Sequence, residues 1–180
     1  NVCVVEADEY DRSFLKLHPN IIAITAMDAD HLDIYGTAYE VEESFLAFTR
    51  NLKEPGLLIS KKGIQREAEL SAVNHFTYHL EDKHADIHAA NLEIVNGAYQ
   101  YDVIGKGWQL KGVTLSMGGL HNVENTLVAI AIAKHLGIEE EKIKLAVEDF
   151  KGVKRRFEFI INSDDQVYID AVSYTHLTLP

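Results

Sequence analysis

The chain has 180 residues, enough for one sizeable domain or for a domain and part of another. Hydrophobic residues make up 47% of it and charged residues 25%, as in an ordinary globular protein, and it has no apolar run long enough to span a membrane. The formal net charge of −11, without a long block of basic residues, argues against a nucleic-acid partner or an anionic membrane surface.

The single cysteine and the first residue suggest where the protein works and whether the chain is complete. Cys3 is the single cysteine, so an internal disulfide is excluded, and a reducing, cytoplasmic setting is the simplest interpretation. The chain begins with Asn1 rather than methionine and opens directly on an apolar run, so we expect the true N-terminus to be missing.

Two short apolar runs near the beginning are predicted to form buried strands. Residues 2–5 and 21–25 are four or five residues long, rich in β-branched side chains and bounded by polar residues. Each run is followed at once by a group of acidic side chains. We call residues 6–11 the first acidic loop and residues 28–33 the second acidic loop, which also carries His31.

The two acidic loops predict a shared site. The carboxyl ends of neighbouring parallel strands lie at one edge of a sheet, and ligands of open α/β proteins bind there. Glu6 of the first loop and His31 of the second would then face one pocket. A carboxylate and an imidazole among further carboxylates suit a divalent cation, which commonly accompanies a nucleotide phosphate. A calcium loop fits less well, because Leu32 stands where an oxygen ligand is needed.

The next stretch has the pattern of an α/β unit. A short turn of helix ends at Pro19, a helix of about fifteen residues begins after Thr37, and a strand follows over residues 57–60. Thr37 and Glu40 form a capping box at the start of the longer helix. Four apolar residues give this helix its buried face: Val41, Phe45, Phe48 and Leu52.

Residues 61–116 consist of short runs in which polar and apolar side chains alternate. We expect antiparallel strands and loops at the edge of the sheet, with a two-residue hairpin turn at Asn96-Gly97. The histidines of this region have no compact ligand spacing, so we interpret them as surface or strand-face residues. They are His75, His79, His84 and His88.

A glycine pair leads into the next predicted helix. Gly118-Gly119 precedes Asn122, the expected N-cap, and Gly137 ends the helix. Unpaired N–H groups at such a helix start favour an anion or a nucleotide, although a plain turn explains this pattern better when it stands alone.

The last part predicts one more helix and then a new domain. The helix covers residues 139–150, with Ile143, Val147 and Phe150 directed inward. Two runs over residues 159–162 and 166–170 are expected to form a hairpin. We place the domain boundary near Gly152.

Four motifs, in one order, resemble those of the Mur ligases, the ATP-dependent amide-bond-forming enzymes of bacterial peptidoglycan synthesis. They are Glu-Ala-Asp-Glu at residues 6–9, Asp-His-Leu-Asp at 30–33, His-Asn-Val-Glu-Asn at 121–125 and Arg-Arg-Phe-Glu at 155–158. The resemblance implies an α/β fold, in which a mostly parallel central sheet is flanked by helices and has an antiparallel edge. The first strands of a Rossmann-like C-terminal domain would follow.

The resemblance also implies roles for five residues. Glu6 and His31 would bind the Mg²⁺ that bridges ATP and the carboxylate of a sugar nucleotide. Asn122 and Asn125 would contact ATP, and Arg156 would approach the nucleotide from the domain junction. In this family the carboxylate of UDP-N-acetylmuramate attacks the γ-phosphate of ATP, and an amine then displaces phosphate from the acyl phosphate. The motifs are most similar to those of members that use L-alanine; a tripeptide from murein recycling is the alternative acceptor.

Departures from the family pattern indicate a fragment. The family's phosphate loop and UDP-binding domain would lie before the first residue, so residues 1–152 are expected to be a central ATPase domain without its phosphate-loop part. Residues 153–170 would begin the C-terminal domain. Residues 171–180 do not fit the family pattern, so we expect them to be a non-native tail. Ala171 stands where the family has a nucleotide-site Asp. By itself the chain is expected to be inactive as a ligase.

Two other interpretations stay open at this point, and no oligomeric state is predicted. A non-catalytic module would bind a nucleotide or a metal through Glu6 and His31 without performing a reaction. A phosphate-loop lysine upstream would distinguish the enzyme from such a module. The acidic loops could also be merely solvated, as isolated Asp and Glu usually are, but four motifs in order argue against this.

Overall fold

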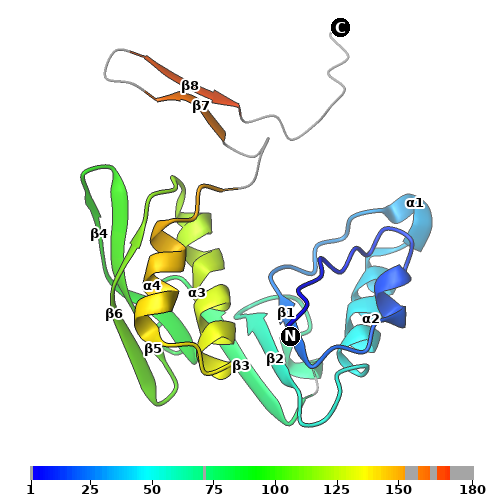
Figure 1. Ribbon diagram of the computed structural model, residues 1–180. Helices are drawn as coiled ribbons and strands as arrows, with labels where there is room; N and C mark the ends of the chain where they lie inside the picture. The colour runs from blue at the N-terminus through cyan, green and yellow to red at the C-terminus, as the bar shows by residue number, and fades with distance from the viewer. Residues whose placement is uncertain (1, 71, 153–157, 163–165, 171–180) are drawn as a thin grey trace, which may run out of the picture.

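The computed structural model describes residues 2–70, 72–152, 158–162 and 166–170. Six strands form one sheet in the order β1-β2-β3-β4-β5-β6, and two more form a separate sheet, β7-β8 (Figure 1). In the large sheet the first three pairings are parallel and the last two antiparallel. The predicted α/β fold, with a mostly parallel sheet and an antiparallel edge, is confirmed.

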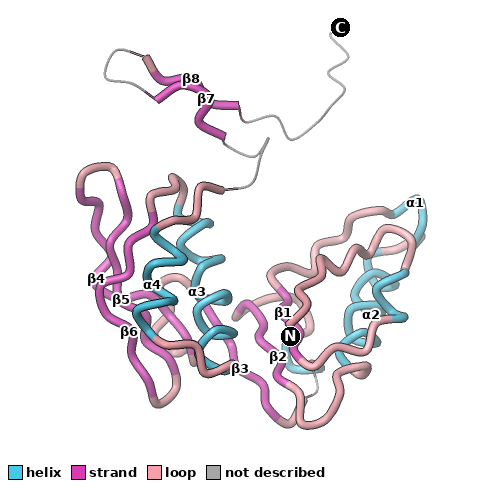
Figure 2. The backbone as a smooth tube through the Cα atoms, in the orientation of Figure 1, coloured by secondary structure: helices cyan, strands magenta, loops and turns pink. Residues whose placement is uncertain are grey.

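The bounds of the elements can be followed along the tube in Figure 2. The strands are β1 (Ile21–Ile24), β2 (Leu57–Lys61), β3 (Asn74–His79), β4 (Ile87–Val95), β5 (Ala98–Gly105), β6 (Trp108–Leu115), β7 (Glu158–Asn162) and β8 (Val167–Asp170). The helices are η1 (Ser13–Lys16), α1 (Leu32–Tyr35), α2 (Ala38–Thr49), η2 (Glu67–Glu69), α3 (Leu120–His135) and α4 (Glu140–Glu148). None of the described helices is long and apolar enough to cross a membrane.

Residues 2–5 contradict the prediction of a first buried strand. They have no strand structure, and Val2, Val4 and Val5 are 69%, 91% and 59% exposed. Among the described residues β1 pairs with β2 alone, so its other edge has no strand beside it. A β-branched run becomes a strand only where a neighbour completes its backbone hydrogen bonds, and the composition of residues 2–5 does not reveal that neighbour.

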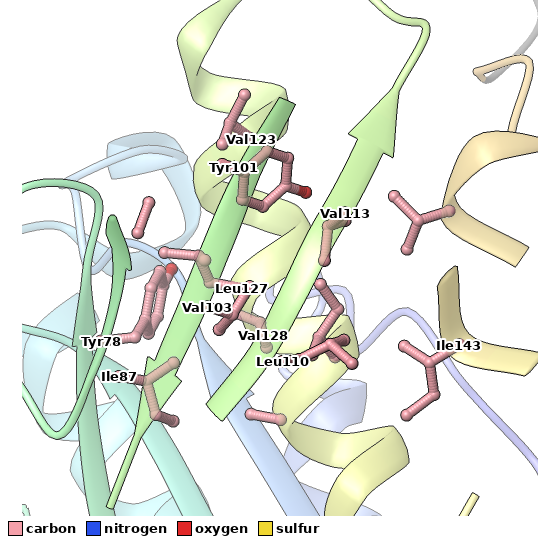
Figure 3. Close-up of a cluster of buried hydrophobic side chains, with 14 of the residues drawn as sticks. Tyr78, Ile87, Tyr101, Val103, Leu110, Val113, Val123, Leu127, Val128 and Ile143 are labelled. Atoms are coloured by element: carbon pink, nitrogen blue, oxygen red, sulfur yellow. The ribbon is translucent and has the colours of Figure 1, made fainter. Parts of the chain in front are cut away.

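β2 is buried on both faces, which explains its uninterrupted apolar run. Leu57 and Ile59 point into a large apolar cluster that includes Leu127 of α3. Leu58 points the other way, into a second cluster with Leu46 of α2. Because alternate residues of a strand face opposite sides, α2 and α3 cover opposite faces of this strand. Figure 3 shows the large cluster, where side chains of α3 meet those of β5, β6 and α4.

α2 confirms the predicted start of its helix. The hydroxyl of Thr37 accepts a hydrogen bond from the Glu40 N–H at 3.2 Å, which satisfies one of the free donors of the first turn. Val41 and Phe48 are buried as expected. The helix ends at Thr49, before Leu52, so it is shorter than predicted.

The prediction for residues 61–116 is correct for the hairpin and wrong for the start of the region. β3 pairs in parallel with β2, and β4 in parallel with β3, so the antiparallel part comprises β4, β5 and β6. The turn at Asn96-Gly97 joins β4 and β5, and both residues have positive φ, as a two-residue hairpin turn of this kind requires. Alternation alone does not distinguish parallel from antiparallel pairing, which explains the error.

The end of the described chain follows the prediction in most respects. Gly137, with φ +73°, closes α3, and β7 and β8 form the predicted antiparallel pair. Ile143 and Val147 of α4 are buried, but Phe150 is 45% exposed. The helix ends at Glu148, so Phe150 lies beyond it and does not share its apolar face.

His75 is one of the strand-face histidines and has a structural partner. Its Nε2 lies 2.7 Å from the hydroxyl oxygen of Ser60, on the neighbouring strand β2. Burial lowers the pKa of the His75 imidazole below its usual value, because desolvation disfavours the charged form.

This lowered pKa predicts a pH dependence of stability. The unfolded chain binds a proton at His75 below about pH 6.5, whereas the folded chain binds it only at lower pH, so the free energy of unfolding should decrease as the pH falls from about 6.5. Urea unfolding between pH 5 and pH 7.5 measures this slope. His75→Gln should flatten the slope, and His84→Gln, at an exposed position, should not. Equal slopes in both variants would contradict the assignment.

Candidate functional site

The two acidic loops meet in the structure, as the sequence predicts. Nε2 of His31, in the second loop, lies 3.5 Å from a carboxylate oxygen of Glu9, in the first. The ring of Tyr10 packs edge-on against the His31 ring, with 5.1 Å between the centroids. The hydroxyl of buried Tyr35 donates a hydrogen bond of 2.6 Å to the Glu9 carbonyl oxygen. The buried Tyr35 therefore links the first acidic loop to α1, the short helix that begins within the second acidic loop.

Tyr35 is suited to this role because a phenol is a neutral hydrogen-bond donor near pH 7. Burial raises the pKa of its phenol, so the hydroxyl remains a donor. The guanidinium group of Arg12 lies over its ring, 4.6 Å from the centroid, and adds a cation–π contact.

His31 has an unusual backbone. Its φ of +56° and ψ of +40° lie in the left-handed region, which non-glycine residues seldom occupy. Its N–H donates to the Asp30 carboxylate at 2.8 Å, and this local bond supports the turn. Left-handed residues other than glycine cluster at functional sites, where the surrounding structure holds them in place. The backbone thus directs the imidazole towards the first acidic loop.

Glu6 takes a different position from the one that the sequence suggests. Its side chain is exposed, and the carboxylate found beside His31 is that of Glu9. In the described part of the chain, no group of three or more His, Cys, Asp or Glu side chains lies close enough to hold a metal ion. Mg²⁺ in nucleotide sites takes one or two carboxylates and completes its shell with phosphates and water. His31 and Glu9 therefore do not form a closed metal centre, and a bound cation would need phosphates and water to complete its shell.

The start of α3 forms the second part of the candidate site, and here one prediction is wrong. Gly119, rather than Asn122, is the N-cap, because its φ of +94° and ψ of +124° suit glycine. Asn122 lies within the first turn, and its amide donates a hydrogen bond of 2.6 Å to the Gly118 carbonyl oxygen. Asn125 is exposed. Arg156 lies outside the described residues.

A substitution at Gly119 should destabilise this helix start. The positive φ of Gly119 is strained for any other residue, whereas the His121 ring, 2.5 Å from a Cβ built there, belongs to an exposed side chain that can rotate away. Gly119→Ala should lower the free energy of unfolding by about 1–3 kcal/mol. Gly63→Ala is the control, because Gly63 also has a positive φ but its Cβ would meet no atom within 4 Å. Urea unfolding compares the two: a similar loss in both variants assigns the cost to the backbone, and an unchanged free energy of unfolding in Gly119→Ala would refute the prediction.

Glu124 is the residue that sequence reasoning missed. One of its carboxylate oxygens lies 2.8 Å from the Lys61 ammonium group at the end of β2, and the other accepts a hydrogen bond of 3.2 Å from the Leu80 N–H, just after β3. It lies inside the His-Asn-Val-Glu-Asn motif, which was the available signal. The start of α3 is therefore tied to the carboxyl ends of two strands, at the sheet edge where the prediction placed the site.

A hollow of about 230 Å³ lies at the other end of α3. The ammonium groups of Lys106 and Lys134 each lie 5.7 Å from an aromatic centroid there, that of Phe76 and that of Trp108 respectively. Each lysine also pairs with a carboxylate. Neither cation lacks a counter-charge, so this hollow is a weaker candidate than the edge with the acidic loops.

Comparison with known proteins identifies the class. The sequence model of one family, the Mur ligase middle domain, matches residues 1–133 of this chain. The chain therefore belongs to the Mur ligase family. It is 42% identical, over 175 residues, to the UDP-N-acetylmuramate–L-alanine ligase of Flavobacterium johnsoniae, a match that covers 97% of this chain and 37% of that enzyme. The chain thus spans little more than a third of the length of this relative.

Solved structures show the same fold. The UDP-N-acetylmuramate-alanine ligase MurC of Thermotoga maritima matches with a TM-score of 0.78 at 24% identity, over 94% of this chain and 38% of that one. A MurF ligase of the same organism, in complex with ADP, matches with a TM-score of 0.66 at 16% identity, over 84% of this chain and 35% of that one. Because both structures are less than 25% identical to this chain, the matches show a shared fold and nothing more.

Proposed function

We propose that the chain is the central part of an ATP-dependent ligase that joins L-alanine to UDP-N-acetylmuramate. The observation that carries the proposal is the 42% identity to an enzyme of that name over 97% of the chain. In the proposed reaction the muramate carboxylate attacks the γ-phosphate of ATP to form an acyl phosphate. The amine of L-alanine then attacks the acyl carbon, and phosphate leaves.

The proposed metal ligands are Glu6 and His31. A bound Mg²⁺ would supply charge neutralisation between the nucleotide phosphates and the muramate carboxylate. The contact of Glu9 with His31 supports this role, because a carboxylate beside a ligand histidine fixes the orientation of the ring. Glu6 is exposed on the same loop, so its carboxylate is accessible to a cation that enters from solvent.

The proposed nucleotide contacts are Asn122 and Asn125, at the start of α3, and Arg156. A helix start favours bound phosphate through its free N–H groups and the dipole of the helix. Residues 1–152 would be the central ATPase domain, and residues 153–170 the beginning of the next domain, from which Arg156 reaches the nucleotide. Residues 171–180 would be a non-native tail. The site of the reaction would be the cytoplasm, where ATP is available.

The test is a coupled phosphate-release assay on the whole enzyme that contains this chain. ATP, Mg²⁺ and UDP-N-acetylmuramate are supplied with L-alanine, with the recycling tripeptide or with no acceptor. Phosphate release that requires L-alanine supports the proposal, and release with the tripeptide alone would assign the chain to the recycling enzymes. ATP binding without any acceptor-dependent release would favour a non-catalytic module. Amide formation by the 180 residues alone would refute the proposal that the chain is an inactive fragment.

A further inference from the structure

The contacts of Glu124 differ from those of an ordinary surface glutamate. Its side chain is 14% exposed, whereas most glutamates face water. Its two oxygens have separate partners: the Lys61 ammonium group at 2.8 Å and the Leu80 N–H at 3.2 Å. These partners belong to the ends of two adjacent parallel strands. One carboxylate thus joins three elements at the carboxyl edge of the sheet.

Hydrogen bonds and ion pairs fix the exact position and rotation of α3, which apolar packing alone does not determine. Leu127 and Ile130 hold α3 against the sheet, but apolar contacts have little dependence on direction and permit a helix to slide or rotate slightly. Hydrogen bonds depend on both distance and angle. Gly119, the N-cap, contributes no side-chain bond to the helix start. Among the residues that the structure describes, two directional links therefore join the first turns of α3 to the sheet: the hydrogen bond between the hydroxyls of Thr126 and Tyr101, on β5, and the bonds of Glu124. Of these, the bonds of Glu124 fix the helix relative to the ends of β2 and β3.

We infer that Glu124 is a positioning residue of the nucleotide site, acting through Lys61 and the Leu80 N–H to hold α3 in register with the sheet edge. The inference rests on the proposed function, because the residues so positioned are Asn122 and Asn125, the proposed ATP contacts. Glu124 lies between them in sequence, on the side of α3 that faces the strand ends. A shift of this turn would move both asparagines together.

The experiment compares variants of the whole enzyme. Glu124→Ala should raise KM for ATP about tenfold, because the displaced asparagines bind ATP less well, and leave kcat at saturating ATP within about twofold. Glu124→Gln retains an oxygen for the Leu80 N–H and should recover a large part of the ATP affinity. Glu141→Ala is the matched control, since Glu141 also pairs with a lysine, Lys144, but is exposed on α4.

Three measurements distinguish a role of Glu124 in positioning the ATP contacts from an effect on protein stability alone. Thermal unfolding reports the stability of each variant, kinetics report KM and kcat, and calorimetry reports the Kd for ATP without turnover. A lower melting temperature in Glu124→Ala with unchanged KM and Kd would overturn the inference, as would a Glu141→Ala variant with the same loss of ATP affinity. If the wild type binds ATP but releases no phosphate with L-alanine, the proposed function fails, and the Kd values still decide the role of Glu124.

Discussion

Replacing His31 by alanine in the whole enzyme should lower kcat/KM by about a thousandfold, the size of effect expected when a group that stabilises developing charge is removed. The imidazole contacts Glu9 through its Nε2. The left-handed backbone that carries it is supported by the Asp30 carboxylate, which accepts a hydrogen bond from the backbone N–H of His31. Alanine retains the backbone N–H that binds the Asp30 carboxylate but removes the proposed ligand. The phosphate-release assay with L-alanine measures the loss, and Glu6→Ala should produce a loss of the same order.

Glu9→Ala should cause a loss of activity that lies between that of His31→Ala and that of a control variant. Glu9 touches His31 and is not itself a proposed ligand, so its removal should cost about 10- to 100-fold, as for groups that orient a metal-binding histidine. His84→Ala, at an exposed position in the loop between β3 and β4, is the matched histidine control. Full activity of His31→Ala and Glu6→Ala would exclude the site at the acidic loops, whatever the overall reaction is.

Leu127→Ala should cause the largest loss of stability, about 2–5 kcal/mol in the free energy of unfolding. Leu127 is fully buried on α3, in the cluster of Figure 3, where it packs among side chains of the sheet. Its truncation removes apolar contacts and leaves a cavity that the rigid surroundings fill only in part.

The control for this substitution is Leu145→Ala. Leu145 is also a helical leucine, on α4, but it is 58% exposed, so its truncation should cost well under about 1 kcal/mol. Urea unfolding measures both variants. A small effect at Leu127, or equal effects at the two positions, would mean that α3 is not packed on the sheet as described.

Local signals in the sequence predicted the parts of the fold that depend on neighbours in the chain. Thr37 caps α2, and Asn96-Gly97 turns the hairpin, because both effects arise within a few residues. The prediction failed where a distant partner decides the outcome. Residues 2–5 have the composition of a strand but no described neighbour to pair with, and β3 has an alternating pattern but pairs in parallel.

The candidate site was predictable to a similar extent. The rule that the ends of parallel strands share an edge led to the prediction that the acidic loops would meet. The loops do meet, but residues 2–5 before the first loop form no strand, so the rule does not explain the contact. It did not select Glu9 rather than Glu6 as the neighbour of His31, because carboxylates three residues apart on a loop carry the same chemistry. The bond between Lys61 and Glu124 joins positions 63 residues apart, and no local pattern encodes it.

The order of the large sheet has a consequence for synthesis on the ribosome. Each strand from β2 to β6 pairs with the strand made just before it. A nascent chain that emerges from its N-terminal end can therefore add one strand at a time to an existing edge, without waiting for a distant segment. α3 follows β6 directly and covers strands that have already been made. β6 is covered soon after it is made, whereas the residues of β2 and β3 that α3 buries stay exposed until α3 itself has been translated. These earlier strands are therefore the part of the sheet most open to aggregation during translation.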